Sequence, residues 1–240
     1  MDILLQHRVF KKSKSNQKRL EMLAMAFLPV TTLSLFLDSV YFRTNFFEAR
    51  MLTNLLVCSF LLLIFFNANA RLRILIFIMP FLSFIGEVLL CKGFGMYEYR
   101  LNDIPFYVPF GHAVIYSSGY LYASTRWATR NKDKMTIILP VIIISALLLS
   151  VVIFNDIFSL IALPLILLVL RRKKWDPLYC YIGICVFVGE ITGAYLKCWT
   201  WSPEIFGIPS GNPPLGALLF YVCGDLMLAK IADRWQKKIR

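Results

Sequence analysis

Long apolar runs, separated by short polar or basic segments, dominate the pattern of this 240-residue chain. A membrane-spanning helix needs about 20 predominantly apolar residues to cross the hydrocarbon core. The runs that approach this length predict eight spans, at residues 22–41, 51–66, 72–91, 105–125, 135–154, 156–170, 178–197 and 212–232. Only Asn155 and Asp156 separate the fifth run from the sixth. A re-entrant hairpin there, which would leave six spans, is the alternative.

The composition agrees with a polytopic membrane protein. Hydrophobic residues make up 58% of the chain, whereas soluble domains contain about 45–50%. The first apolar run follows a basic, polar segment and is long enough to span, so we expect a permanent helix rather than a cleaved signal. We therefore expect an all-α fold, a bundle of about eight transmembrane helices.

The distribution of basic residues predicts the orientation. If both termini are cytoplasmic, 21 of the 26 Lys and Arg residues lie on the cytoplasmic side, as the positive-inside rule requires. The net charge of +12 then reflects contact with anionic lipid headgroups at the cytoplasmic face. No nucleic-acid-binding motif accompanies this charge. We expect a multi-pass protein of the bacterial inner membrane.

Two segments of the chain resemble each other. GEVLLCKGFGMYEYRLNDIPFYVPFGHAVIY at residues 86–116 has a counterpart in GEITGAYLKCWTWSPEIFGIPSGNPPLGALLFY at residues 189–221. The matched pairs are Gly86-Glu87 with Gly189-Glu190, Tyr97-x-Tyr99 with Trp199-x-Trp201, Ile104-Pro105 with Ile208-Pro209, and Pro109-x-Gly111-x4-Tyr116-x2-Gly119 with Pro214-x-Gly216-x4-Tyr221-x2-Gly224. This ordered series predicts a tandem duplication.

The duplication implies a domain organisation. The predicted parts are a basic cytoplasmic tail (1–21), a first four-helix repeat (22–125), a cytoplasmic linker (126–134), a second four-helix repeat (135–232) and a basic cytoplasmic tail (233–240). Repeats with an even number of spans run parallel, related by an axis along the membrane normal. Both motif copies then lie on the outer side. Irregular backbone there must be covered by protein or reached by water, so residues 92–108 and 198–213 are expected to cap the bundle.

Glu87, Glu190 and His112 are the candidate catalytic residues. An acid within a membrane span indicates a functional site, and a buried carboxyl that stays protonated can act as a general acid. The alternative is that each Glu holds the irregular backbone or a neighbouring helix. His112 is matched by Ala217 in the second copy, so it is expected either to carry a proton for one half only or to be a hydrogen-bonded interfacial residue.

Aromatic and acidic side chains near these groups form the candidate substrate-binding set: Tyr97, Tyr99, Trp199, Trp201, Tyr116, Tyr221 and Asp225. The rings either belong to the interfacial aromatic belt or line a cleft, where their faces would stabilise a cation. Tyr116 lies one helical turn after His112, and Asp225 lies one turn after Tyr221, so each pair shares a helix face. Arg100 is expected to bind an anionic headgroup or to pair with Glu204.

No cofactor or metal is expected. The six cysteines are scattered, without a CxxC motif or a Cys/His cluster, which argues against a zinc or iron–sulfur site. Cys91 and Cys198 both fall near the outer ends of spans, where either a disulfide or two buried thiols could form.

At the repeated motifs the sequence resembles integral-membrane carotenoid-biosynthesis proteins, the carotenoid hydratases and more distantly the small lycopene cyclases. The matching residues are Glu87, Gly95, Tyr97, Tyr99 and Pro109, echoed by Glu190, Trp199, Trp201 and Pro214. The cyclases carry a Pro-x-Glu-Glu type element where this chain has Pro109 to His112. The resemblance implies hydration or cyclisation of an isoprenoid that begins with protonation of a C=C bond.

Three functional classes stay open at this point. The first is an enzyme that acts on an isoprenoid or other membrane lipid. The second is a transporter or flippase, against which the nearly apolar cytoplasmic halves of the spans argue. The third is a non-catalytic scaffold or assembly factor, which would bind another membrane protein that the sequence does not identify.

Overall fold

A computed structural model describes residues 14–239, and most of them are helical. The helices are α1 (Lys14–Leu37), α2 (Val40–Asn45), α3 (Arg50–Asn67), α4 (Ala70–Glu87), α5 (Tyr107–Ala123), α6 (Arg126–Arg130), α7 (Lys132–Phe154), α8 (Ile157–Arg172), α9 (Pro177–Tyr195) and α10 (Leu218–Ile239). A π-helical turn, η2 (Val88–Gly93), continues α4, and a 3-10 turn, η3 (Leu215–Ala217), precedes α10. The helical class expected from the sequence is thereby confirmed.

Six helical stretches in the described part of the chain are long and apolar enough to cross a membrane, which indicates a membrane protein. They are Gln17–Leu37, Arg50–Asn67, Ala70–Gly93, Lys132–Phe154, Pro177–Tyr195 and Leu215–Ala232. The two other predicted runs also form helices, but α5 and α8 have only 17 and 16 residues. Length and composition therefore support six spans, and the number eight stays a prediction.

The segments expected at the two ends and at the centre contain helix. Residues 1–13 of the expected N-terminal tail, and Arg240 of the C-terminal one, lie outside the described residues. Helix α1 begins at Lys14, inside the expected tail, and α10 continues to Ile239. The expected linker, residues 126–134, holds α6 and the start of α7.

The boundary between α7 and α8 is a tight turn. Asn155 adopts a left-handed conformation with φ of 51° and ends α7. Asp156, which is fully buried, caps α8 by accepting a hydrogen bond from the Ser159 amide at 3.1 Å. The same carboxylate accepts the Leu215 amide at 3.2 Å. The two polar residues therefore separate two helices, and Asp156 fastens their turn to η3, just before α10.

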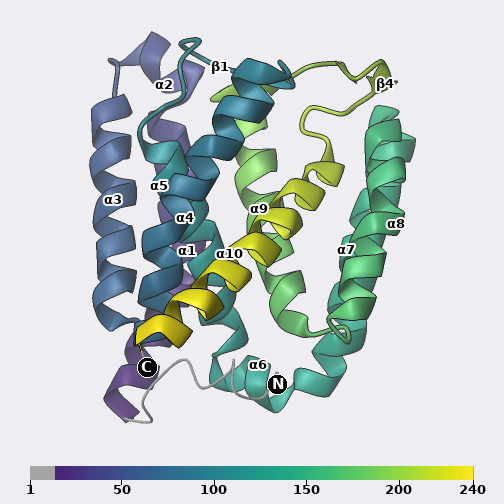
Figure 1. The fold of residues 1–240 in the computed structure, drawn as a ribbon. Helices are drawn as coiled ribbons and strands as arrows, with labels where there is room; N and C mark the ends of the chain where they lie inside the picture. The colour runs from purple at the N-terminus through teal and green to yellow at the C-terminus, as the bar shows by residue number, and fades with distance from the viewer. Residues whose placement is uncertain (1–13, 240) are drawn as a thin grey trace.

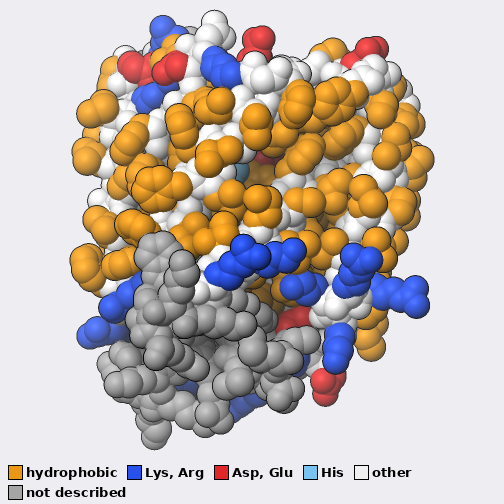
Figure 2. All heavy atoms as spheres, viewed as in Figure 1, with side chains coloured by type: hydrophobic (Ala, Val, Ile, Leu, Met, Phe, Trp, Pro, Cys, Tyr) orange, Lys and Arg blue, Asp and Glu red, His pale blue; other side chains and the backbone are white. Residues whose placement is uncertain are grey.

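The helices form a bundle with its strands at one end (Figure 1). Helices α5 and α9 lie inside the bundle, α3 forms one edge, and the α7–α8 pair forms the other. The four strands, β1 (Tyr97–Tyr99), β2 (Trp199–Trp201), β3 (Glu204–Ile205) and β4 (Ile208–Pro209), lie at the end opposite to α6. In Figure 2, hydrophobic side chains form a broad band, and Lys and Arg gather below it at the α6 end.

Helices α5 and α9 approach each other closely at Gly119. A Cβ atom added there would lie 2.4 Å from Cγ1 of Ile182 and 2.8 Å from its Cα. Small residues allow such close backbone approach between helices in membranes. The α5–α9 contact therefore depends on the absence of a side chain at this position.

Gly119→Ala is expected to lower the free energy of unfolding by about 1–3 kcal/mol, because overpacking against the Ile182 backbone forces the helices apart. Thermal unfolding of the purified protein in detergent measures the change. Gly111→Ala on the same helix is the matched control, because a Cβ at Gly111 meets nothing within 4 Å. Equal stability of the two variants would contradict the close approach.

Candidate functional site

Glu87 is the last residue of α4, directly before the π-helical turn, and it is only 4% exposed. π-Helical turns are frequent at functional sites. Oε2 of Glu87 accepts hydrogen bonds from the hydroxyls of Tyr97 at 2.8 Å and Tyr99 at 2.5 Å. Oε1 lies 3.1 Å from Nε2 of His112, which comes from α5. Glu87 and His112, proposed together from the sequence, are thus in direct contact.

Glu190 on α9 has a parallel arrangement. It is 7% exposed. Oε2 accepts the indole N–H groups of Trp199 at 3.1 Å and Trp201 at 3.2 Å. Oε1 accepts the hydroxyl of Tyr221, from α10, at 2.7 Å. Each glutamate therefore contacts two rings from the strand that follows its own helix and one ring from the next long helix.

Strand pairing brings the two arrangements together. Strands β1 and β2 are antiparallel, with Tyr97 opposite Trp201 and Tyr99 opposite Trp199. The centroids of the first ring pair are 4.5 Å apart and those of the second are 6.1 Å apart. The four rings that donate to the glutamates thus form one cluster over both carboxyl groups. Strands β1 and β2 with these four rings are called the cap.

A contact between α5 and α10 also connects the side chains that bind the two glutamates. The His112 ring stacks on the Tyr221 ring, with centroids 5.0 Å apart and an interplanar angle of 20°. Both glutamates and all six side chains that contact them line one cavity of about 360 Å³. Most of the remaining wall is apolar, as in typical small-molecule sites. Two carboxyl groups therefore share a single apolar cavity.

Two members of the expected binding set lie elsewhere. Tyr116 and Asp225 are buried, and the Tyr116 hydroxyl donates a hydrogen bond to that of Tyr120 at 3.1 Å. Neither Tyr116 nor Asp225 lines the cavity. The sequence places Tyr116 one helical turn after His112, and Asp225 one turn after Tyr221. In the structure, this one turn along the helix is enough to put both residues outside the cavity.

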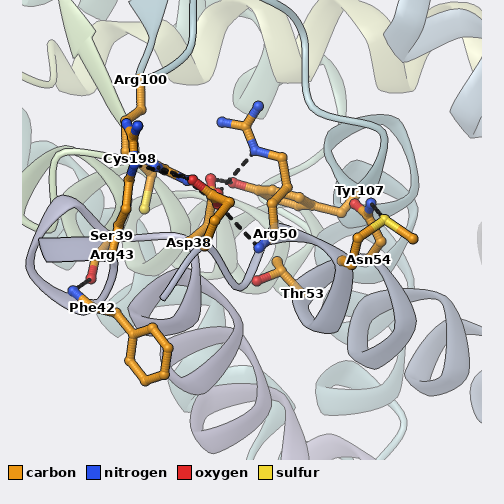
Figure 3. A network of polar contacts seen from close by, with 12 residues as sticks. Asp38, Ser39, Phe42, Arg43, Arg50, Thr53, Asn54, Arg100, Tyr107 and Cys198 are labelled. Carbon is orange, nitrogen blue, oxygen red and sulfur yellow. Dashed lines mark hydrogen bonds and ion pairs between the residues drawn. The ribbon is translucent and has the colours of Figure 1, made fainter. Parts of the chain in front are cut away.

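An ion-pair network fastens the cap to the bundle (Figure 3). Its centre is Asp38, which is fully buried just after α1. Oδ1 of Asp38 lies 3.0 Å from Nε of Arg50 and 2.8 Å from Nη2 of Arg100, and Oδ2 accepts the Tyr107 hydroxyl at 2.9 Å. Arg50 belongs to α3, Arg100 follows β1, and Tyr107 begins α5. One carboxylate therefore joins four segments of the chain.

Arg100 also contacts Glu48, at 2.7 and 2.8 Å. Its ion-pair partners are thus Asp38 and Glu48, and the expected pairing with Glu204 is wrong. Sequence analysis missed this pairing because Glu48 is 52 residues away in the chain and no local pattern connects the two. The pairing holds Arg100 beside the strand that carries Tyr97 and Tyr99.

Protonation states outside the helical spans follow from these contacts. Burial, reinforced by the Glu87 carboxylate, raises the pKa of Tyr97 and of Tyr99, so both phenols stay protonated and donate to Glu87 at neutral pH. Hydrogen bonds from Arg100 lower the pKa of Glu48 and in turn raise the pKa of Arg100. Because the pKa of Glu48 is lowered, its ionised carboxylate stabilises the folded state. This contribution to stability is lost as the pH falls below the usual range of a glutamate.

The Trp199 ring lies directly over the backbone of α9. A Cβ atom on Gly193 would come within 2.1 Å of this ring. The nearest atoms to this position all belong to the Trp199 ring. The glycine therefore makes room for the ring that donates to Glu190.

The cysteines are thiols in the described structure. Cys91 and Cys198 are both buried and free, so the disulfide alternative is not observed. Cys198 donates its S–H to the carbonyl oxygen of Leu35 at 3.1 Å. Among residues 14–239, no group of three or more His, Cys, Asp or Glu side chains is arranged to hold a metal ion.

Comparison of the chain with protein-family models, with curated proteins and with solved structures finds no match. The protein is thus defined by its fold and site, as a helical membrane protein with two carboxyl groups at one apolar cavity. The resemblance to carotenoid-biosynthesis proteins stays a prediction from the motifs.

Arg100→Gln is expected to destabilise the cap by about 1–3 kcal/mol, because it leaves Asp38 and Glu48 with fewer hydrogen-bond donors. Faster hydrogen–deuterium exchange in residues 97–101 would report the loss. Arg43→Gln is the matched control, since Arg43 also contacts Glu48, at 3.4 Å, but with half of its side chain exposed. Unchanged exchange in Arg100→Gln would show that the network does not hold the cap.

Proposed function

We propose that this protein is a membrane enzyme that protonates a C=C bond of an isoprenoid and so starts its hydration or cyclisation. The observation that carries this proposal is the pair Glu87 and Glu190, buried at one apolar cavity with aromatic rings around them. An alkene is a weak base, so its protonation needs an acid held away from bulk water. The cavity supplies such an acid and excludes other polar groups from most of its wall.

The contacts of each glutamate suit proton donation. The proposal requires that one of the two carboxyl groups carries a proton when the substrate binds. When one glutamate gives up this proton, three side-chain groups already face its oxygens and stabilise the new negative charge. The aromatic faces of the cap lie beside the same carboxyls and stabilise the carbocation that forms.

Hydration on this site is balanced in protons and electrons. The acidic glutamate transfers its proton to one carbon of the double bond, whose π electrons form the new C–H bond. A water oxygen then bonds to the cationic carbon, and the proton it releases returns to the glutamate, directly or through His112. The sum is the addition of one water molecule. In cyclisation, a second double bond replaces the water as nucleophile, and a carbon next to the new cation gives its proton back to the glutamate while the C–H electrons form a double bond.

The strand register supports the tandem duplication. Tyr97 and Tyr99 are matched in sequence to Trp199 and Trp201, and the strands pair about the central residues Glu98 and Thr200. Antiparallel pairing of matched segments about a common centre is what a two-fold axis through the cap produces. This supports two parallel repeats, each with four spans, and makes the glutamates matched members of one site.

The proposed setting is the bacterial inner membrane, with eight spans and both termini in the cytoplasm. The Lys and Arg side chains at the α6 end support this orientation (Figure 2). The cap and the glutamates then lie toward the outer leaflet, where an isoprenoid dissolved in the bilayer can reach them. Anionic headgroups would contact the basic end.

Glu87→Gln and Glu190→Gln are each expected to lower the rate of product formation by about 10²-fold or more, because a general acid typically contributes 10²–10⁴-fold. The measurement is the lipid and pigment profile of membranes that contain each variant, at equal protein abundance. Glu98→Gln is the matched control, since Glu98 lies between Tyr97 and Tyr99 on the same strand but is exposed. Wild-type turnover in both glutamine variants at the site would refute acid catalysis.

A non-catalytic scaffold is the second candidate. It is favoured by the complete set of hydrogen bonds to Glu87 and Glu190 within the chain, which resembles a structural tether. In that case the two Gln variants would lose folding or abundance rather than product alone. Unfolding temperatures measured beside the product profile separate the two candidates.

A further inference from the structure

Three glycine pairs that match in sequence have opposite surroundings in the structure. Gly119, Gly189 and Gly216 are packed: an added Cβ would lie 2.4 Å from Ile182, 3.1 Å from Ile115 and 2.7 Å from Ser159, respectively. Their sequence counterparts, Gly224, Gly86 and Gly111, would each carry a Cβ with nothing within 4 Å. One member of each of these three pairs is thus closely packed, and the other is not.

The three unpacked glycines all line the cavity of the two glutamates, and of the packed ones only Gly189 does. They come from α4, α10 and α5, whereas Gly119 and Gly189 lie at the close α5–α9 contact. If the halves are repeats, the α5–α9 and α4–α10 contacts are equivalent. The α5–α9 contact is filled by direct packing at Gly119 and Gly189. The α4–α10 contact has free space at Gly86 and Gly224.

The open contact reaches the apolar surface of the bundle. Helices α4 and α10 diverge toward the cap in Figure 1, and Figure 2 shows a hollow in this region with histidine and carboxylate colours at its bottom. Around it, Ile85, Leu89 and Met227 line the cavity and are each more than half exposed. The mouth therefore faces hydrocarbon once the apolar band is placed in a bilayer.

The inner wall of the cavity contains an unsatisfied hydroxyl. Ser34 on α1 lines the cavity, is 2% exposed, and its Oγ has no hydrogen-bond partner in the described structure. A buried hydroxyl without a partner is destabilising, so a ligand atom that bonds to it is favoured there. Val57 and Phe60 of α3 complete this part of the wall with apolar surface.

We propose that the cavity binds one slender isoprenoid chain, which enters from the bilayer between α4 and α10 and places a hydroxyl group against Ser34. The chain passes Gly86 and Gly224, where the absence of a side chain leaves room for it, and crosses the faces of the two carboxyl groups. This proposal rests on the proposed function for the isoprenoid nature of the chain and for the hydroxyl, which hydration would create.

Photolabelling of the purified protein with a diazirine analogue of geranylgeraniol tests the path. Gly86→Leu and Gly224→Leu are each expected to lower labelling by about tenfold or more, a loss of about 1.4 kcal/mol in binding, with the unfolding temperature retained. If a Leu variant fails to fold, Gly86→Ala or Gly224→Ala replaces it in the test. These variants add only a methyl group, so they are expected to give smaller losses of labelling. Val88→Leu, in η2 directly after α4, is the matched control, because Val88 is exposed and does not line the cavity.

Ser34→Ala tests the polar end. It is expected to weaken competition by geranylgeraniol while leaving competition by the corresponding hydrocarbon unchanged, and equal effects on both competitors would overturn the placement of the hydroxyl. Wild-type labelling of folded Gly86→Leu and Gly224→Leu would overturn the path between α4 and α10.

The glutamine variants separate this proposal from the function it rests on. Glu87→Gln and Glu190→Gln should retain labelling and lose product. If the Leu variants lose labelling while the Gln variants still form product, the path stands and acid catalysis fails. If the Leu variants label normally while the Gln variants lose product, acid catalysis stands and the path fails.

Discussion

The architecture depends on supplying hydrogen-bond donors to two carboxyl groups inside an apolar bundle. A buried carboxylate without donors would be strongly destabilising in a membrane. The pairing of β1 with β2 meets this need, because Tyr97 and Tyr99 donate to Glu87, and the opposed indoles donate to Glu190. Two three-residue strands have little stability by themselves, so the strands and the glutamates hold each other in place.

The same constraint explains the features around the cap. Asp38 joins the end of α1 to Arg50, Arg100 and Tyr107, so the segment between α4 and α5 is fixed after β1 and at the start of α5. Gly193 lets Trp199 rest on α9. The rigid support is concentrated beside the glutamates, while the contact between α4 and α10 is left open. A fixed set of hydrogen-bond donors beside an apolar cavity is the combination that the proposed protonation of a hydrophobic substrate requires.

Periodicity and motif matching predicted the helices and the acid–aromatic site, because apolar runs and repeated residues are local signals. They could not predict the partner of each strand, since three residues carry no register information. They also could not fix helix rotation: Tyr221 donates to Glu190, whereas its matched residue Tyr116 donates to Tyr120. The network around Asp38 and the unpaired Ser34 hydroxyl depend on contacts between distant segments, which a single sequence does not encode in any local pattern.

Cross-linking of the two cap strands tests most directly that the motif copies meet over one site. Glu98 and Thr200 are exposed and directly opposite in the register. Hydrogen-bonded antiparallel partners have Cα atoms about 5.5 Å apart, within the range of about 4.4–6.8 Å for disulfides. Mild oxidation should therefore link Glu98→Cys to Thr200→Cys in the folded protein and leave the pair Glu98→Cys and Glu204→Cys unlinked. Failure of the first pair to link, or equal linking of both pairs, would contradict the account.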